Sequence, residues 1–178
     1  VNQTLIGGNM VGVCEALLYA HRAGLNMDTV MESVASGAAG SWSLSNLGAL
    51  ALSQGDPGAA LRHLDRALQV VLAAGPGVAT DLARIQSRRG RALGELARLP
   101  EARAAFLEAR RLFAGTLGAD HATAWQATAG LALVEHLSGN TAAAERLFRS
   151  VADAPGYRLE VNAGRRQEAE ALHARFLA

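Results

Sequence analysis

The sequence contains no lysine, a single cysteine, few aromatic residues and no long apolar run. The lone Cys14 cannot form a disulfide within the chain, so nothing in the sequence requires an oxidising compartment. The apolar runs are far shorter than the roughly 20 residues that a membrane span needs, and the N-terminus lacks the basic region of a secretory signal. We therefore expect a cytoplasmic protein without membrane contact.

The charges are nearly balanced, and this argues against a nucleic-acid partner. The 17 basic residues, all arginines, face 16 acidic residues, which gives a net charge of +1. Such a chain has no overall field that attracts polyanions, and aromatic residues at 4% leave few side chains for base stacking. We read the absence of lysine, beside the many alanines, as codon usage rather than phosphate chemistry.

Ala and Leu dominate the sequence, and both are strong helix formers. Four sets of residues recur with a step of 42 residues, which predicts three repeats. The small residue of each repeat should let a second helix approach, and the large residue should fill the space between repeats. The four sets are Gly48, Gly90 and Ala132; Ala60, Ala102 and Ala144; Leu64, Phe106 and Phe148; and Ala67, Ala109 and Val151.

Short turn signals divide each repeat into two helices. They are Gly55-Asp56-Pro57, Leu99-Pro100 and Gly139-Asn140-Thr141. Gly allows the left-handed conformation that ends a helix, Asp or Thr can cap the next helix, and Pro suits a first helical turn. Each repeat is therefore predicted to be a helical hairpin.

Leu47-Gly48, followed by Ala60, Leu64 and Ala67, stands at the spacing of the tetratricopeptide family, which residues 44–153 resemble. The resemblance implies an all-α, right-handed solenoid of three hairpins. An amphipathic segment at residues 164–177 is expected to be its C-terminal capping helix. Three residues depart from the family pattern: Arg89 replaces a Leu, Ala97 a turn Gly and Glu135 an aromatic residue.

Residues 1–43 do not share the repeat. From Thr4 to His21 the chain is apolar or small on nearly every side, which predicts a helix buried all round, with Cys14 as an inert buried thiol. This helix needs cover from the first repeat or from a second copy of the chain. We favour a monomer, in which residues 1–43 and 44–178 pack as one domain, and a homodimer is the alternative.

The string from Val1 to Met10, with the later segment Ser36 to Trp42, resembles the start of the helical C-terminal domain of 3-hydroxyisobutyrate dehydrogenases. In that family a catalytic Lys lies three residues before a substrate-binding Asn, which Asn2 matches, and that Lys position precedes Val1. No G-x-G-x-x-G follows a strand, and Gly7-Gly8 is expected inside a helix. We therefore expect no cofactor, no catalytic residue and no enzyme activity.

Residues 41–46 read acceptably in both families, so a splice there would preserve the helix. We therefore interpret the chain as an engineered chimera, a non-enzymatic scaffold of helical hairpins. The alternative is a natural tetratricopeptide module that binds a peptide or protein partner. The N-terminal helix would fill the groove in one arrangement and extend the solenoid in another.

The resemblance to the tetratricopeptide family implies a candidate peptide groove that contains Arg84, Ser87, Arg91, Gln126 and His136. Arginines at helical spacing on one face could bind an acidic peptide through charge-assisted, bidentate contacts. We favour a simpler interpretation, in which the arginines lie on a solvated face and pair with nearby acids. Those acids are Glu95 and Asp81. The five histidines are scattered without ligand spacing, so no metal site is predicted.

Overall fold

The computed structural model describes residues 12, 14–27, 29–30, 40–73, 78–118, 121–154 and 163–177. Throughout these ranges the regular elements are α-helices, which confirms the predicted all-α class. The helices with defined bounds are α3 (Gly40–Ser53), α4 (Pro57–Ala73), α5 (Ala79–Glu95), α6 (Leu99–Thr116), α7 (Ala122–Leu137), α8 (Thr141–Ala152) and α9 (Ala163–Leu177).

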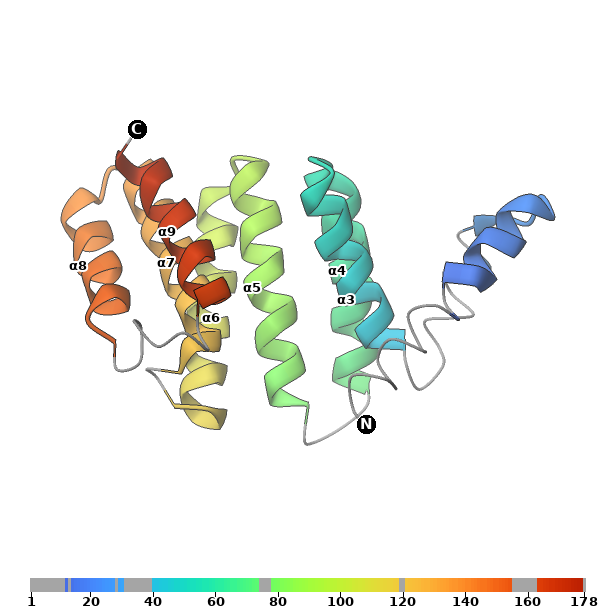
Figure 1. Ribbon diagram of the computed structural model, residues 1–178, viewed down its shortest axis with the longest axis horizontal. Helices are drawn as coiled ribbons and strands as arrows, with labels where there is room; N and C mark the ends of the chain where they lie inside the picture. Colours follow the sequence, from blue (N-terminus) through green and yellow to red (C-terminus); the bar gives the residue numbers. More distant parts are fainter. Residues whose placement is uncertain are drawn as a thin grey trace.

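Consecutive helices form three hairpins, α3–α4, α5–α6 and α7–α8, and each hairpin packs against the next (Figure 1). The last helix, α9, folds back onto α7. The array therefore has two layers, with α3, α5 and α7 in one and α4, α6 and α8 in the other. The right-handed winding of a solenoid and the division at residues 43 and 44 stay predictions.

The turns of the three hairpins have the predicted geometry. Gly55, Ala97 and Gly139, which are 42 residues apart, have positive φ angles of 76°, 58° and 85°. Asp56 caps α4, because its Oδ1 accepts a hydrogen bond from the backbone N–H of Ala59 at 2.8 Å. Ala97 therefore adopts the left-handed conformation that Gly adopts in the other two turns.

The small residue of each repeat makes room for a large one. A Cβ added to Gly48 would lie 2.6 Å from Cγ of Leu64, and one added to Gly90 would lie 2.8 Å from Cδ2 of Phe106. The Phe106 ring also contacts Gly130, where an added Cβ would lie 2.4 Å from its Cζ. The predicted close approach is confirmed, and Phe106 is held between α5 and α7.

Buried apolar residues form two clusters. The larger spans α3 to α7 and contains Phe113, which is 1% exposed. The second joins α7, α8 and α9 around Trp125 and Phe148, and the His173 ring of α9 stacks on Phe148 at 4.6 Å. Helix α9 is therefore part of the folded array, as expected for a terminal helix.

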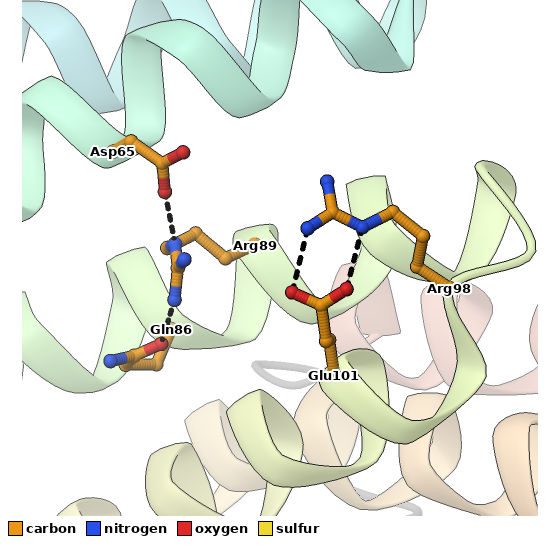
Figure 2. Close-up of polar contacts among 5 residues, drawn as sticks. All are labelled: Asp65, Gln86, Arg89, Arg98 and Glu101. Atoms are coloured by element: carbon orange, nitrogen blue, oxygen red, sulfur yellow. Dashed lines mark hydrogen bonds and ion pairs between the residues drawn. The ribbon is translucent and has the colours of Figure 1, made fainter.

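Arg89 and Glu135, which replace apolar residues of the resembled pattern, are hydrogen-bonded between helices. Figure 2 shows Arg89 reaching from α5 to Asp65 of α4, with Nε 2.7 Å from Oδ1. Nη1 of Arg89 also donates to Gln86 at 2.9 Å. Glu135 of α7 accepts from Arg103 of α6. These polar contacts let charged side chains occupy helix interfaces.

Figure 2 also shows a paired contact at the start of α6, where Arg98 donates twice to Glu101, at 2.7 and 2.6 Å. The hydrogen bonds from Arg98, followed by its charge, hold the pKa of the Glu101 carboxyl below its ordinary value. Both groups are largely exposed, so the pair adds little to stability.

The predicted burial of the N-terminal helix is wrong for the residues that the structure describes. Residues 14–22 are helical, but Leu18 and Tyr19 are 52% and 74% exposed, and Cys14 is exposed. In Figure 1 this segment lies beyond the hairpin α3–α4, apart from the remaining helices. Apolar composition predicted burial, but burial also requires a neighbouring surface. Asn2 and Gly7-Gly8 lie outside the described residues.

The described residues provide neither a membrane-spanning helix nor a cluster of metal ligands. None of their helices is both long and apolar enough to cross a membrane. The same residues contain no group of three or more His, Cys, Asp or Glu side chains arranged to hold a metal ion.

Candidate functional site

A cavity of about 700 Å³ lies among α3, α5, α7 and α9. Four of the five predicted groove residues line it, namely Arg84, Ser87, Arg91 and Gln126. His136, the fifth, is not among the lining residues. None of the described residues 14–27 lines the cavity. The structure therefore brings most of the predicted set together, whereas their role in binding stays a prediction.

Small residues on the inner helices leave the cavity hollow. Ala49 of α3, Gly94 of α5 and Gly130 of α7 line it without large side chains. The ring of Phe106 reaches the cavity from α6, and Val134 of α7 lies beside it. Both are almost fully buried, so the floor of the cavity is apolar.

Three arginines of α5 line the cavity, Arg84, Arg88 and Arg91. They occupy positions i, i+4 and i+7, which lie on one face of a helix. Arg84 forms an ion pair with Asp81, and Nε of Arg91 lies 3.0 Å from Oε1 of Glu95. The predicted pairing with these two acids is confirmed.

The two ion pairs are accessible to solvent. The side chains of Arg84 and Arg91 are 48% and 45% exposed. Exposed pairs contribute about 0–1 kcal/mol, so another anion can replace the acidic partner at small cost.

Arg88 has a different role from its neighbours. Its Nη1 donates to the backbone carbonyl of Ser45 at 2.9 Å and to the Ser45 hydroxyl at 2.5 Å. These bonds connect α5 to α3 across the cavity wall. A smaller cavity of about 30 Å³ lies beside this contact, and Trp42 and Ser45 line it.

Sequence reasoning missed several lining residues. Arg88 lies four residues after Arg84, on the same face of the predicted helix, and this spacing could have identified it. Thr123 of α7 lines the cavity together with the predicted Gln126, three residues further along the same helix. Ala171 and Leu172 of α9 also line the cavity. No repeat position predicts those two, because α9 lies outside the 42-residue period.

A second polar centre lies where α6 meets the α7–α8 turn. Glu135, whose side chain is 7% exposed, accepts from Nε of Arg103 at 2.7 Å and from Nδ2 of Asn140 at 2.8 Å. Burial raises the pKa of the Glu135 carboxyl, but the hydrogen bonds from Asn140 and Arg103, with the Arg103 charge, outweigh it, so the pKa lies below its ordinary value. The ionised carboxylate holds the helices together and is a structural group.

Comparison with known families gives a match over residues 1–89, which is half of the chain. The matching family is described as the NAD-binding domain of NADP-dependent 3-hydroxyisobutyrate dehydrogenase. The matched range contains α3 and α4 and ends within α5. It includes Arg84 and Arg88 of the cavity wall but not Arg91.

Curated relatives are similar to the chain over a somewhat shorter length. The chain is 44% identical over 73 residues to "Uncharacterized oxidoreductase YkwC" of Bacillus subtilis, covering 40% of this chain and 25% of that protein. It is 39% identical over 72 residues to "Probable 3-hydroxyisobutyrate dehydrogenase-like 1, mitochondrial" of Arabidopsis thaliana, covering 40% and 22%. A third relative, "Uncharacterized oxidoreductase slr0229" of Synechocystis, is 38% identical over 72 residues, covering 39% and 24%. The chain spans about a quarter of the length of these relatives.

The family match overturns the interpretation of the chain as an engineered chimera. That interpretation placed a splice at residues 41–46, whereas the match continues through this segment to residue 89. The hairpin α3–α4, assigned from its sequence to a tetratricopeptide scaffold, lies inside the matched range. Residues 41–46 suited either family, and only the longer match separates the two assignments.

Proposed function

The chain belongs to the 3-hydroxyisobutyrate dehydrogenase family through its NAD-binding helical domain, and from this premise we propose that it is part of a nicotinamide-dependent oxidoreductase. The proposed reaction is the oxidation of a small hydroxy acid, in which the carbon that bears the hydroxyl would lose a hydride to the nicotinamide cofactor and the hydroxyl would release its proton to solvent. One observation carries this proposal, namely the match over residues 1–89. The helical structure of residues 40–73 and 79–89 supports it, because a helical domain is expected there.

Two expectations from the sequence are wrong in the light of this membership. The chain was expected to be a non-enzymatic scaffold or a peptide-binding module, and it was expected not to be an enzyme. The family and the names of the relatives point to oxidoreductases instead. Neither the missing G-x-G-x-x-G motif nor the 42-residue repeat excludes membership of this family.

The described residues do not by themselves fit a nicotinamide dinucleotide. Pyrophosphate binding in doubly wound folds uses a strand, a glycine turn and the N-terminus of the following helix. The described residues contain no strand and therefore no such cradle. We assign no step of hydride transfer to α3–α9, and the proposal rests on the matched N-terminal segment.

Asn2 is the residue of the matched segment with a role implied by resemblance, at a position that binds substrate in the family. It lies outside the described residues. An Asn side chain both donates and accepts hydrogen bonds, which suits the hydroxyl and carboxylate of a hydroxy acid. We propose that Asn2 orients the substrate of this oxidoreductase.

The test is substrate binding by the full chain. A panel of 3-hydroxy acids is titrated calorimetrically into the protein in the presence of NADP⁺ or NAD⁺, and saturable binding of at least one acid is expected. Asn2→Ala should weaken this binding about tenfold, the effect of losing one hydrogen bond of about 1.4 kcal/mol, whereas Gln3→Ala should not. Absence of binding by every acid with both cofactors would contradict the proposal.

A further inference from the structure

The cavity among α3, α5, α7 and α9 combines a cationic wall with an apolar floor. Three arginines and one acid, Glu95, are the charged residues among its described lining. Small-molecule sites have volumes of about 300–1,000 Å³ and place a few polar groups around an apolar surface. We propose that this cavity binds an amphiphilic organic anion, with a carboxylate or phosphate head and an apolar body, in addition to the proposed oxidoreductase activity.

The head of the ligand would lie against Arg84 and Arg91. These residues are seven positions apart on α5, which places them about 10 Å apart along the cavity. Arg84 contacts Asp81 through Nη2, and Arg91 contacts Glu95 through Nε. Each guanidinium has five N–H groups, so each retains donors for a carboxylate or phosphate while it contacts its acid.

The surroundings of the arginines favour an anion over a cation. The opposite wall, on α7, presents Thr123 and Gln126, which are uncharged. An anion in the cavity would therefore meet Glu95 as the one like charge among the described lining residues. The net charge of the lining is positive, which raises the local concentration of anions.

The apolar body would lie on the floor and at the C-terminal end of α7. Phe106, Phe113 and Val134 form the buried floor. Leu137 lines the cavity and is 54% exposed, and Leu172 of α9 lies in the same lining. A fully hydrated anion such as inorganic phosphate would leave this apolar surface uncovered, whereas an alkyl chain would remove it from water.

The ligand chemistry is tested by calorimetric titration of the full chain with four probes. Octanoate and octyl phosphate carry both head and body, octanol lacks the charge, and inorganic phosphate lacks the body. One molecule of octanoate or octyl phosphate is expected to bind per chain, at least tenfold more tightly than octanol or inorganic phosphate. The relative affinities of the first two decide between a carboxylate and a phosphate head.

Three results would overturn the proposal. Equal affinity for octanol would mean that the cavity binds apolar groups without regard to charge. Equal affinity for inorganic phosphate would mean an adventitious ion only. Failure of both octyl anions to bind would mean that the cavity is no ligand site.

Substitutions in the cavity wall test whether the octyl anions bind in this cavity. Arg84→Gln combined with Arg91→Gln should weaken octyl-anion binding at least tenfold. Gly94→Leu should also weaken it, because a Cβ there would lie 3.8 Å from Cγ2 of Val134, an ordinary contact, and the longer side chain would enter the cavity. Arg111→Gln is the control, since Arg111 pairs with Glu108 on α6 and does not line the cavity.

Circular dichroism melts establish that each variant is folded. Unchanged binding in both cavity variants, or an equal loss in the Arg111→Gln control, would overturn the assignment to this cavity. The test does not depend on the proposed oxidoreductase function, because neither the probes nor the readout involves hydride transfer.

Discussion

Helix α7 and residues 14–22 are both rich in apolar side chains, but these side chains are mostly buried in α7 and mostly exposed in residues 14–22. Along α7, Leu131 is 2% exposed and Trp125 is also 2% exposed. In the N-terminal segment, Leu18 is 52% and Tyr19 is 74% exposed. Both segments are helical, so local propensity does not distinguish them.

The difference in exposure depends on which helices pack against each segment. Helix α7 contacts α5, α6, α8 and α9, so most of its apolar side chains meet another helix. The N-terminal segment lies at the end of the array, beyond α3–α4 (Figure 1). Apolar residues stabilise a fold only where a second surface removes them from water, because the hydrophobic free energy scales with the area buried.

Matched leucine truncations give the most direct measure of this comparison. Leu131→Ala should destabilise the protein by about 2–5 kcal/mol, because it removes buried methyl groups and leaves a cavity. Leu18→Ala should change the free energy of unfolding by no more than about 0.5 kcal/mol. Urea denaturation of both variants measures the two values, and similar losses would show that the N-terminal helix is covered in solution.

The buried carboxylate of α7 should be the next largest contributor. Glu135→Gln is expected to lower the free energy of unfolding by about 1.5–3 kcal/mol at neutral pH, the range for hydrogen bonds to charged groups. Glu145→Gln, on the exposed face of α8, is the control and should have an effect below about 0.5 kcal/mol.

The pH dependence of this effect has a definite sign. Because the pKa of Glu135 is lowered by folding, its ionised form contributes stability above its ordinary pKa. That contribution is lost as the pH falls through the lowered value. The difference between wild type and Glu135→Gln should therefore shrink in acid, and a difference that grows in acid would contradict the assignment.

Two glycine substitutions compare the interior of the array with its surface. Gly130→Ala should destabilise by about 1–3 kcal/mol, because the new methyl group would overlap the ring of Phe106. Gly115→Ala on α6 has nothing within 4 Å and should stabilise by about 0.5 kcal/mol through helix propensity. Thermal melts that show the same sign for both would refute tight packing between α6 and α7.

The smallest predicted effect concerns the hairpin turns. Ala97→Gly should stabilise the protein by about 1 kcal/mol, because Ala occupies a left-handed conformation that Gly adopts without strain. Gly55→Ala, at the equivalent turn, should lower stability by a similar amount. Denaturation midpoints measure both, and a destabilising Ala97→Gly would mean that the Ala97 side chain stabilises the turn in another way.

Local structure was predictable wherever neighbours in sequence determine it. The 42-residue step located the turns at Gly55, Ala97 and Gly139, and the small residues at 48 and 90 contact the large side chains expected. The cavity residues Arg84, Ser87 and Arg91 of α5 followed from the groove positions that the resemblance implied. These features were predictable because each depends on the spacing of residues along the chain or on the size of one side chain.

Features that depend on distant surfaces were not predictable. The exposure of residues 14–22 depends on what lies beside them, and the position of α9 over the cavity depends on packing outside the repeat. The dehydrogenase resemblance was assigned to too short a segment, since residues 41–46 read acceptably in both families. Only a comparison extending to residue 89 separated the alternatives.

We propose that the chain takes part in nicotinamide-dependent oxidoreduction, and cofactor binding tests this proposal most directly. The full chain is titrated into NADPH while the fluorescence of the reduced nicotinamide is followed, with NADH in parallel and octanoate added to occupy the anion cavity. We predict saturable binding at one cofactor per chain that octanoate does not displace. A linear, non-saturating response with both cofactors would contradict the account.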